Sequence, residues 1–281
     1  MPTVFTMVFK SQQPDISCKS SALFCAYLGS IAYFLDQVSY FITFERETPS
    51  ALLSCQFRSC YLLCISLICL QVPRDITIWQ WLFESKASPL SRFPANEVRG
   101  FTNALTKERL SYHEVKQCTT QLSTALVKKY GFKEGDTVSL FSPNTIWYPV
   151  AMHGVSRVGG IISGASPAYN VEEMTYALKK SNAKYLMTVA GSMEIAAAAA
   201  KNAGMLKENV FLLDGSMAGF KTVKDLIEVG KGFGDHGQVK SFNIPPGKKN
   251  GDVCAFLSFS SGTTGLPKAV RTWSNTRPRH D

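Results

Sequence analysis

The sequence predicts an α/β fold, with parallel sheets carrying helices on both faces, over residues 73–270. Apolar segments of strand length alternate with helical segments of about 10–15 residues, and this alternation favours parallel strands joined by crossover helices. Polar capping residues precede several helical segments and glycines follow them. The apolar content of 45%, with 18% charged residues, is that of an ordinary globular protein.

The first expected helix begins at Ser111, which with Glu114 has the spacing of a capping box. Apolar residues then recur at helical spacing, and Gly131 ends the helix. The Gly135-Asp136 turn leads into a strand over 137–141. We expect the following helix to be capped by Asn144 and kinked at Pro149.

The same alternation continues to residue 259. Asn170 and Glu173 form a second expected capping box, which starts a helix that ends near Ser181. The remaining expected elements, in chain order, are strands at 161–163, 184–189, 209–213 and 253–259, and helices at 192–203 and 222–229.

The net charge of +9 lies entirely in residues 73–281, because residues 1–72 contain four basic and four acidic side chains. A positive balance suits anionic ligands. The lysines are scattered rather than clustered on one face, so we expect no nucleic-acid partner.

Residues 1–72 form an atypical apolar extension with six of the eight cysteines. The last four follow a C-x4-C-x3-C-x4-C spacing that is not a zinc-ligand pattern, and they stand among leucines and isoleucines. We expect buried thiols in a reducing compartment rather than disulfides. Apolar stretches at 20–44 and 59–73 leave membrane association as an alternative, although each uncharged run is shorter than a membrane span.

The segment from Ser260 to Lys268 has the composition of a phosphate-binding loop. Four hydroxyl groups can donate hydrogen bonds, two glycines allow close backbone approach, and Lys268 supplies a positive charge. The spacing is not that of a Walker A loop. The candidate ligand-binding residues are Ser260, Ser261, Gly262, Thr263, Thr264, Gly265 and Lys268.

The string SSGTTGLPK resembles the signature of the adenylate-forming superfamily. Further similarity lies in the segments beginning at Arg109 (RLSYHE), Gly135 (GDTV) and Ser166 (SPAYN). Among the subfamilies, the sequence most resembles 4-coumarate–CoA ligase and acyl-CoA synthetases. The resemblance implies the N-terminal part of the large domain, with residues 73–270 as a partial adenylation domain.

Several functional expectations follow from this resemblance alone. Members use ATP, Mg²⁺ and coenzyme A to convert a carboxylic acid, either an aryl or a fatty acid, into an acyl-adenylate and then an acyl-CoA. The seven candidate residues would hold the β- and γ-phosphates. A cytoplasmic or peroxisomal location is implied, and no targeting signal is recognised.

The tail 271–281 does not match the family, and the positions that bind Mg²⁺, ribose and adenine in relatives lie beyond the match. The chain therefore contains no complete set of catalytic residues, and we expect it to be inactive alone. A non-catalytic ATP-binding or interaction fragment is the alternative. Two other motifs are interpreted as structural: the G-x-G-x-x-G match at 232–237, which follows a helix rather than a strand, and the lone residues His113 and His153.

Overall fold

The computed structural model describes residues 75–92, 100–260 and 268–273. The chain divides into two compact units, Met1–Val72 and Pro73–Asp281, and all described residues belong to the second unit. Residues 20–44 and 59–73, on which the membrane alternative depends, lie outside the described part. None of the helices in the described ranges is both long and apolar enough to cross a bilayer.

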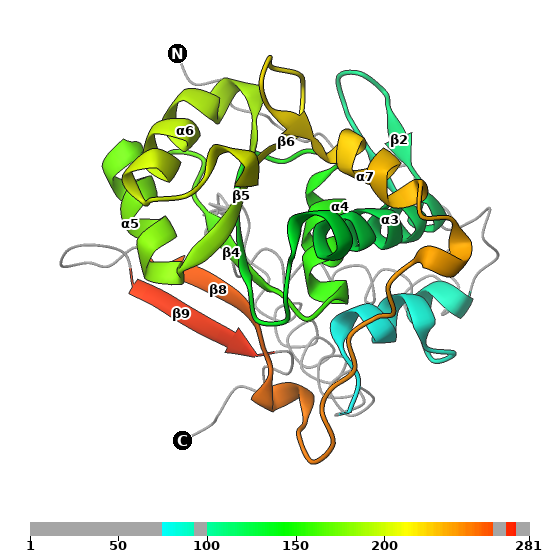
Figure 1. Cartoon of the computed structure of the whole chain (residues 1–281). Helices are drawn as coiled ribbons and strands as arrows, with labels where there is room; N and C mark the ends of the chain where they lie inside the picture. Colours follow the sequence, from blue (N-terminus) through cyan, green and yellow to red (C-terminus); the bar gives the residue numbers. More distant parts are fainter. Residues whose placement is uncertain (1–74, 93–99, 261–267, 274–281) are drawn as a thin grey trace, which may run out of the picture. The chain divides into compact units, whose positions relative to one another are not determined.

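The second unit alternates strands and helices along the chain (Figure 1). The helices are α3 Tyr112–Tyr130, α4 Tyr148–Arg157, α5 Val171–Ser181, α6 Met193–Asn202 and α7 Val223–Lys231. The strands are β1 Phe101–Thr102, β2 Arg109–Leu110, β3 Thr137–Phe141, β4 Ile161–Ala165, β5 Ala183–Val189, β6 Val210–Asp214, β7 Lys221–Thr222, β8 Cys254–Ser260 and β9 Lys268–Trp273. Short helical turns lie at Gln80–Glu84, Pro89–Arg92, Ala190–Ser192, Lys207–Asn209, Asp235–Gly237 and Asn250–Asp252.

Within the described residues, strands β3 to β9 form one sheet in the order β7-β6-β5-β3-β4-β8-β9. All neighbouring pairs from β7 to β8 are parallel. Only β9 runs antiparallel, as the hairpin partner of β8. The prediction of a largely parallel sheet is therefore confirmed, and the hairpin adds an edge strand that the sequence pattern did not indicate.

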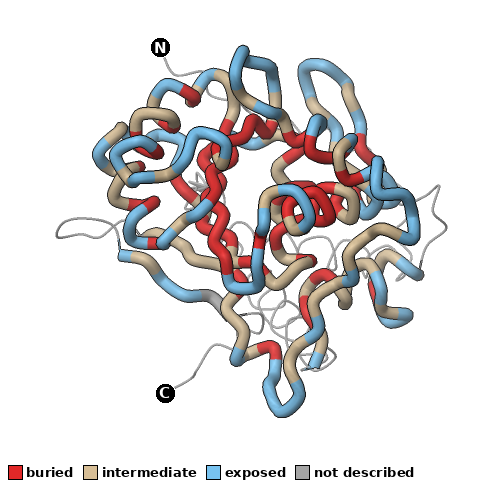
Figure 2. The backbone as a smooth tube through the Cα atoms, viewed as in Figure 1, coloured by how far each residue is buried: buried red, intermediate tan, exposed pale blue. Residues whose placement is uncertain are grey.

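The helices cover both faces of this sheet, as predicted (Figure 1). Helices α3, α4 and α7 pack on one face over a core that includes Leu122, Val138 and Ile162. Helices α5 and α6 pack on the other face over a second core that includes Phe141 and Leu186. The central strands are buried between these layers (Figure 2), which explains why their sequences are continuously apolar rather than alternating.

Capping boxes set the beginnings of three helices. Ser111 with Glu114 begins α3, and Asn170 with Glu173 begins α5, both as predicted from the sequence. Thr222 with Asp225 begins α7, a third capping box that sequence reasoning missed. The end of α3 at Gly131, with φ of 68°, is also confirmed.

The predicted beginning of α4 is wrong. Asn144 does not cap this helix, because residues after it first form a turn and the helix begins only at Tyr148, after Trp147. Pro149 consequently lies in the first helical turn rather than at a kink. A proline fits there because first-turn backbone N–H groups have no partner within the helix.

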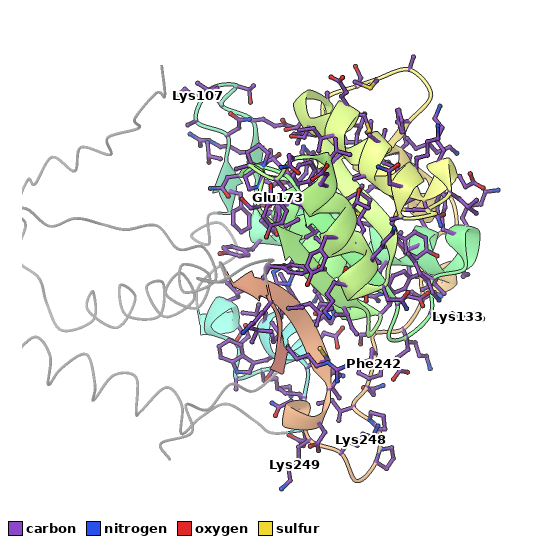
Figure 3. All side chains as sticks on the ribbon, turned by 90° about the vertical axis from the view of Figure 1, so that its left-hand side faces the viewer. Lys107, Lys133, Glu173, Phe242, Lys248 and Lys249 are labelled. Atoms are coloured by element: carbon purple, nitrogen blue, oxygen red, sulfur yellow. The ribbon has the colours of Figure 1, made fainter. Side chains whose placement is uncertain are left out.

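The lysines of the described residues are spread over several elements (Figure 3). Lys107 lies in the β1–β2 hairpin, Lys133 follows α3, and Lys248 and Lys249 belong to the loop before β8. Three salt bridges are formed in the described part: Lys184 with Asp136, Lys224 with Glu108, and Lys231 with Glu228.

Candidate functional site

The described part of the candidate phosphate-binding segment is the base of the β8–β9 hairpin. Ser260 is the last residue of β8 and Lys268 is the first residue of β9, and the two are direct partners in the antiparallel register. The hairpin therefore sets Ser260 and Lys268 opposite each other in the backbone ladder at its base.

The other predicted residues of the segment, Ser261, Gly262, Thr263, Thr264 and Gly265, lie outside the described residues. Lys268 is exposed. The expectation that the segment follows the carboxyl end of a strand is confirmed by the position of Ser260 at the end of β8.

The hairpin adjoins a point where the chain connections diverge. From β4 the chain passes through α5 to β5, on the far side of β3, whereas from β8 it turns the other way into β9. In open α/β sheets, ligands bind at the carboxyl ends of strands at such a divergence. The carboxyl ends of β4 and β8 are therefore a position at which this fold favours a ligand.

The first helix residue of α4 reaches this position. A Cβ atom placed on Gly164 of β4 would have Tyr148 Oη as its near neighbour, at 3.8 Å. Gly164 is the register partner of Ser258 in β8. Burial raises the pKa of Tyr148 to about 12, so its hydroxyl keeps its proton at neutral pH.

The loop after β4 is built from local hydrogen bonds. The backbone N–H of Ala168 donates to Ser166 Oγ at 3.3 Å, and the Asn170 side chain caps α5. Burial, reinforced by the negative charge of Glu173, raises the pKa of Tyr169. This loop is the SPAYN segment of the sequence, and it follows the carboxyl end of β4. Because β4 and β8 are parallel, that end lies on the same side of the sheet as the hairpin base at the end of β8.

A second polar cluster, which sequence reasoning missed, lies at the carboxyl end of β6. Thr145 Oγ1 donates to Asp214 Oδ2 at 2.9 Å, and the Gly215 N–H donates to Asp214 Oδ1 at 2.8 Å. The Lys224 ammonium lies 3.1 Å from Glu108 and 4.8 Å from the centre of the Trp147 ring. No spacing signal could have revealed the cluster, because its members come from separate parts of the chain.

This cluster borders a cavity of about 240 Å³ lined by Leu213, Asp214, Gly215, Thr222 and Lys224. The cavity lies beside β6, and β5, β3 and β4 separate it from β8 within the sheet. The cluster and the hairpin base are therefore two distinct features, both at the carboxyl ends of strands of the same sheet.

His153 and the G-x-G-x-x-G match, which are interpreted as structural from the sequence, lie apart from the hairpin base. His153 lies on α4 beside Phe83, with ring centres 5.3 Å apart, and burial lowers its pKa to about 4. The G-x-G-x-x-G match follows α7 and includes only a short helical turn at Asp235–Gly237. Cys118 and Cys254 are thiols rather than disulfide partners.

Potential metal ligands do not gather in the described ranges, where no group of three or more His, Cys, Asp or Glu side chains could hold a metal ion. The candidate residues in those ranges are Ser260 and Lys268, whose residue types supply a hydroxyl and an ammonium group. Such donors fit phosphate oxygens, because both hydroxyl and ammonium groups donate hydrogen bonds to anions.

Comparison with known protein families identifies the class to which this arrangement belongs. The family described as AMP-binding enzyme matches residues 92–272. Because this match covers more than half of the chain, the chain belongs to the AMP-binding enzyme family. The match includes β8, the candidate segment and most of β9.

Curated relatives of the chain are CoA ligases. The acyl-CoA ligase azaF of Aspergillus niger is 30% identical over 200 residues, which are 69% of this chain and 35% of that protein. 4-coumarate–CoA ligase-like 1 of Arabidopsis thaliana is 31% identical over 170 residues, or 60% of this chain and 29% of that protein. The chain thus spans about a third of the length of these relatives.

Solved structures show the same fold. A long-chain-fatty-acid–CoA ligase from Archaeoglobus fulgidus superposes with a TM-score of 0.59 at 19% identity, over 72% of this chain and 38% of that one. An anthranilate CoA ligase in complex with anthranoyl-AMP gives a TM-score of 0.57 at 20% identity, over 74% and 36% of the two chains. The predicted fold class is therefore confirmed.

Proposed function

We propose that the segment from Ser260 to Lys268 is the polyphosphate-binding part of a ligase. This ligase would activate a carboxylic acid with ATP and then form an acyl-CoA. The observation that carries the proposal is the pairing of Ser260 with Lys268 at the carboxyl end of β8. This pairing sets a serine and a lysine opposite each other in the backbone register at the two ends of a hydroxyl- and glycine-rich segment, within a chain of the AMP-binding family.

The chemistry requires stabilisation of a leaving group. A carboxylate oxygen of the acid attacks the α-phosphorus of ATP, the bond from that phosphorus to the bridging oxygen breaks, and pyrophosphate leaves with the bonding electrons. Lys268 and the hydroxyls of Ser260, Ser261, Thr263 and Thr264 would bind the β- and γ-phosphates. Donors that are already in place for the developing charge lower the barrier, because they need no reorganisation during the reaction.

The substrate class follows from the relatives. Their names describe ligases for 4-coumarate, phenylacetate and other acids, so we propose an aryl or fatty carboxylic acid as substrate. Mg²⁺ would accompany ATP as in the family, and coenzyme A would accept the acyl group.

Binding of pyrophosphate and ATP by isothermal titration calorimetry tests the proposal. Hydrogen bonds to charged groups contribute roughly 1.5–3 kcal/mol each, so Lys268→Ala is expected to weaken binding about 10- to 100-fold. The matched control is Lys248→Ala, which removes the same charge from the exposed loop before β8. Equal affinities of wild type and Lys268→Ala would contradict the assignment of Lys268.

A non-catalytic ATP-binding fragment is the second candidate. The two candidates differ in turnover. We expect the 281-residue chain alone to bind pyrophosphate without acid-dependent ATP–pyrophosphate exchange, because positioning of all reacting groups is needed for catalysis. Exchange above the level of Lys268→Ala, measured with cinnamic, benzoic and fatty acids, would show that the chain is itself a complete catalyst.

A further inference from the structure

The cavity of about 240 Å³ beside β6 lies where that strand ends and α7 begins. It therefore borders the carboxyl end of a strand in a parallel sheet, which is where open α/β sheets bind ligands. It is smaller than most pockets for drug-sized molecules, which measure roughly 300–1,000 Å³, so it fits a ligand of only a few heavy atoms. Two of its lining residues, Gly215 and Lys224, are exposed, so small solutes can reach it.

The Asp214 carboxylate on the cavity wall is held in a fixed orientation. The Trp147 N–H donates to Thr145 Oγ1 at 3.4 Å, and the Thr145 hydroxyl in turn donates to Asp214 Oδ2 at 2.9 Å. The Gly215 N–H donates to Asp214 Oδ1 at 2.8 Å. An ionised carboxylate has about four lone-pair positions, so each of its oxygens retains the capacity to accept from one further donor.

The charge of Asp214 is not balanced by a cation of the described part of the chain. No Lys, Arg or His nitrogen in that part lies within 4.0 Å of its carboxylate oxygens. The neighbouring Lys224 ammonium instead lies 3.1 Å from Glu108 Oε1 and 4.8 Å from the centre of the Trp147 ring. Because Lys224 and Glu108 offset each other, Asp214 leaves this end of the cavity with a net negative charge.

The start of α7 does not reverse that sign. The positive end of a helix dipole lies at its N-terminus, but here the Asp225 carboxylate offsets it, accepting from the Thr222 N–H at 2.7 Å and the Thr222 hydroxyl at 2.8 Å. Lys221, just before this cap, is exposed and does not line the cavity. An anionic ligand would therefore meet the Asp214 carboxylate, whereas a cation with N–H donors would fit its remaining lone pairs.

We propose that this cavity is a second ligand-binding site of the chain and that its ligand is a small organic ammonium ion. The ammonium N–H groups donate to Oδ1 and Oδ2 of Asp214, and Thr145 keeps that carboxylate oriented. Lys224 repels the ligand, and Glu108 limits this repulsion by pairing with Lys224. The site is separate from the β8–β9 hairpin, so the inference goes beyond the proposed function and does not depend on it.

The test is an NMR titration of the 281-residue chain with propylammonium chloride at constant, low ionic strength. It follows the amide of Gly215, whose N–H bonds to Asp214. Two further probes separate the contributions: propyltrimethylammonium has the same charge but no N–H donor, and propionate has the opposite charge. The variants are Asp214→Asn, Lys224→Met and the control Asp235→Asn, which removes an exposed carboxylate beyond the C-terminal end of α7.

Propylammonium should produce a saturable shift of the Gly215 amide, with a millimolar dissociation constant because the probe is so small. Loss of charge-assisted hydrogen bonds should weaken its binding about tenfold or more in Asp214→Asn, and the quaternary probe should bind the wild type about tenfold more weakly. Lys224→Met removes a like charge and should strengthen binding about two- to fivefold. Asp235→Asn should bind as the wild type does.

The absence of a saturable Gly215 shift with propylammonium would overturn the inference, as would an unchanged affinity in Asp214→Asn. Saturable binding of propionate that weakens in Lys224→Met would identify an anion site and overturn it as well. If the urea unfolding curve shows that Asp214→Asn does not fold, Lys224→Met decides. Tighter propylammonium binding by that variant supports the cation site, and weaker binding overturns it.

Discussion

The Thr145 hydroxyl donates a 2.9 Å hydrogen bond to the Asp214 carboxylate and so joins the loop after β3 to the end of β6. Strand β5 lies between β3 and β6 in the sheet, so this bond bridges across a strand to which neither residue belongs. The two residues are 69 positions apart in the sequence. Open α/β sheets bind ligands at the carboxyl ends of their strands. In this sheet those ends are joined by a side-chain hydrogen bond as well as by the backbone ladder.

Removing this bond is expected to destabilise the fold. Thr145→Val leaves the partly buried Asp214 carboxylate with one fewer donor, which should lower the free energy of unfolding by about 1–2 kcal/mol. A double-mutant cycle with Asp214→Ala, measured by urea unfolding, isolates the pair. We expect a coupling energy of about 1 kcal/mol, whereas strictly additive effects would show that the bond contributes nothing.

His153 should make stability depend on pH. Its folded-state pKa, lowered to about 4 by burial, lies below the ordinary value of 6.5, so the unfolded chain binds a proton more readily. Above about pH 6.5 the histidine is neutral in both the folded and the unfolded chain. The free energy of unfolding is expected to fall as the pH drops from 6.5 towards 4. The linked loss is roughly 3 kcal/mol once the pH is below the folded pKa.

The His153→Phe variant supplies the comparison, because it keeps a ring beside Trp79 and Phe83 but cannot be protonated. Carboxyl groups titrate in both proteins, so the difference between the two unfolding curves at each pH reports His153. A difference that stays constant from pH 7 to pH 4 would rule out a depressed histidine pKa.

Gly230 is expected to be required for the contact between α3 and α7. A Cβ atom at this position would lie 1.9 Å from the backbone oxygen of Gln121, so alanine would force the two helices apart. The intrinsic gain of about 1 kcal/mol for alanine over glycine in a helix should be outweighed. We predict a net loss of about 2 kcal/mol or more in the free energy of unfolding of Gly230→Ala.

Gly191 provides the matched control, since a Cβ atom there would meet no heavy atom within 4 Å. Its backbone lies in a short helical turn with no positive φ, so Gly191→Ala should change stability by less than about 0.5 kcal/mol. Similar unfolding midpoints for the two alanine variants would mean that α3 and α7 do not pack as closely as the structure indicates.

Local sequence signals predicted most of the elements and few of their partners. The capping boxes at Ser111 and Asn170 located two helix beginnings, and the range 137–141 matched β3. These features depend on residues close together in the chain. The strand order does not, because β5 follows β4 in the chain but pairs with β3, and that pairing joins residues far apart in the sequence.

The candidate site was predictable only in part, for the same reason. Lys268 and Ser260 belong to one short motif, so composition alone indicated their shared chemistry. Tyr148 stands in an apolar helix start with no motif around it, and its relation to the site depends on Gly164 being the neighbour of Ser258. The β9 strand was missed because Lys268 and Arg271 interrupt the apolar pattern that would have indicated an edge strand.

Two buried hydroxyl groups in the centre of the sheet give the last prediction. Ser139 of β3 and Ser163 of β4 are register partners and fully buried, and neither hydroxyl has a hydrogen-bond partner among the described residues. A buried polar group without a partner costs about 1–3 kcal/mol. Ser139→Ala and Ser163→Ala are therefore each expected to raise the free energy of unfolding by about 1 kcal/mol.

Thr188→Val is the opposing control for these two variants. The Thr188 hydroxyl lies on the same face of the neighbouring strand β5 and is also fully buried, but it donates to the Phe141 carbonyl oxygen at 2.7 Å. Its removal leaves that bond unmade and should lower the free energy of unfolding by about 1 kcal/mol. Urea unfolding of the three variants decides the matter: if the serine variants are destabilised as Thr188→Val is, their hydroxyl groups must have partners, such as an ordered water bridging the two strands.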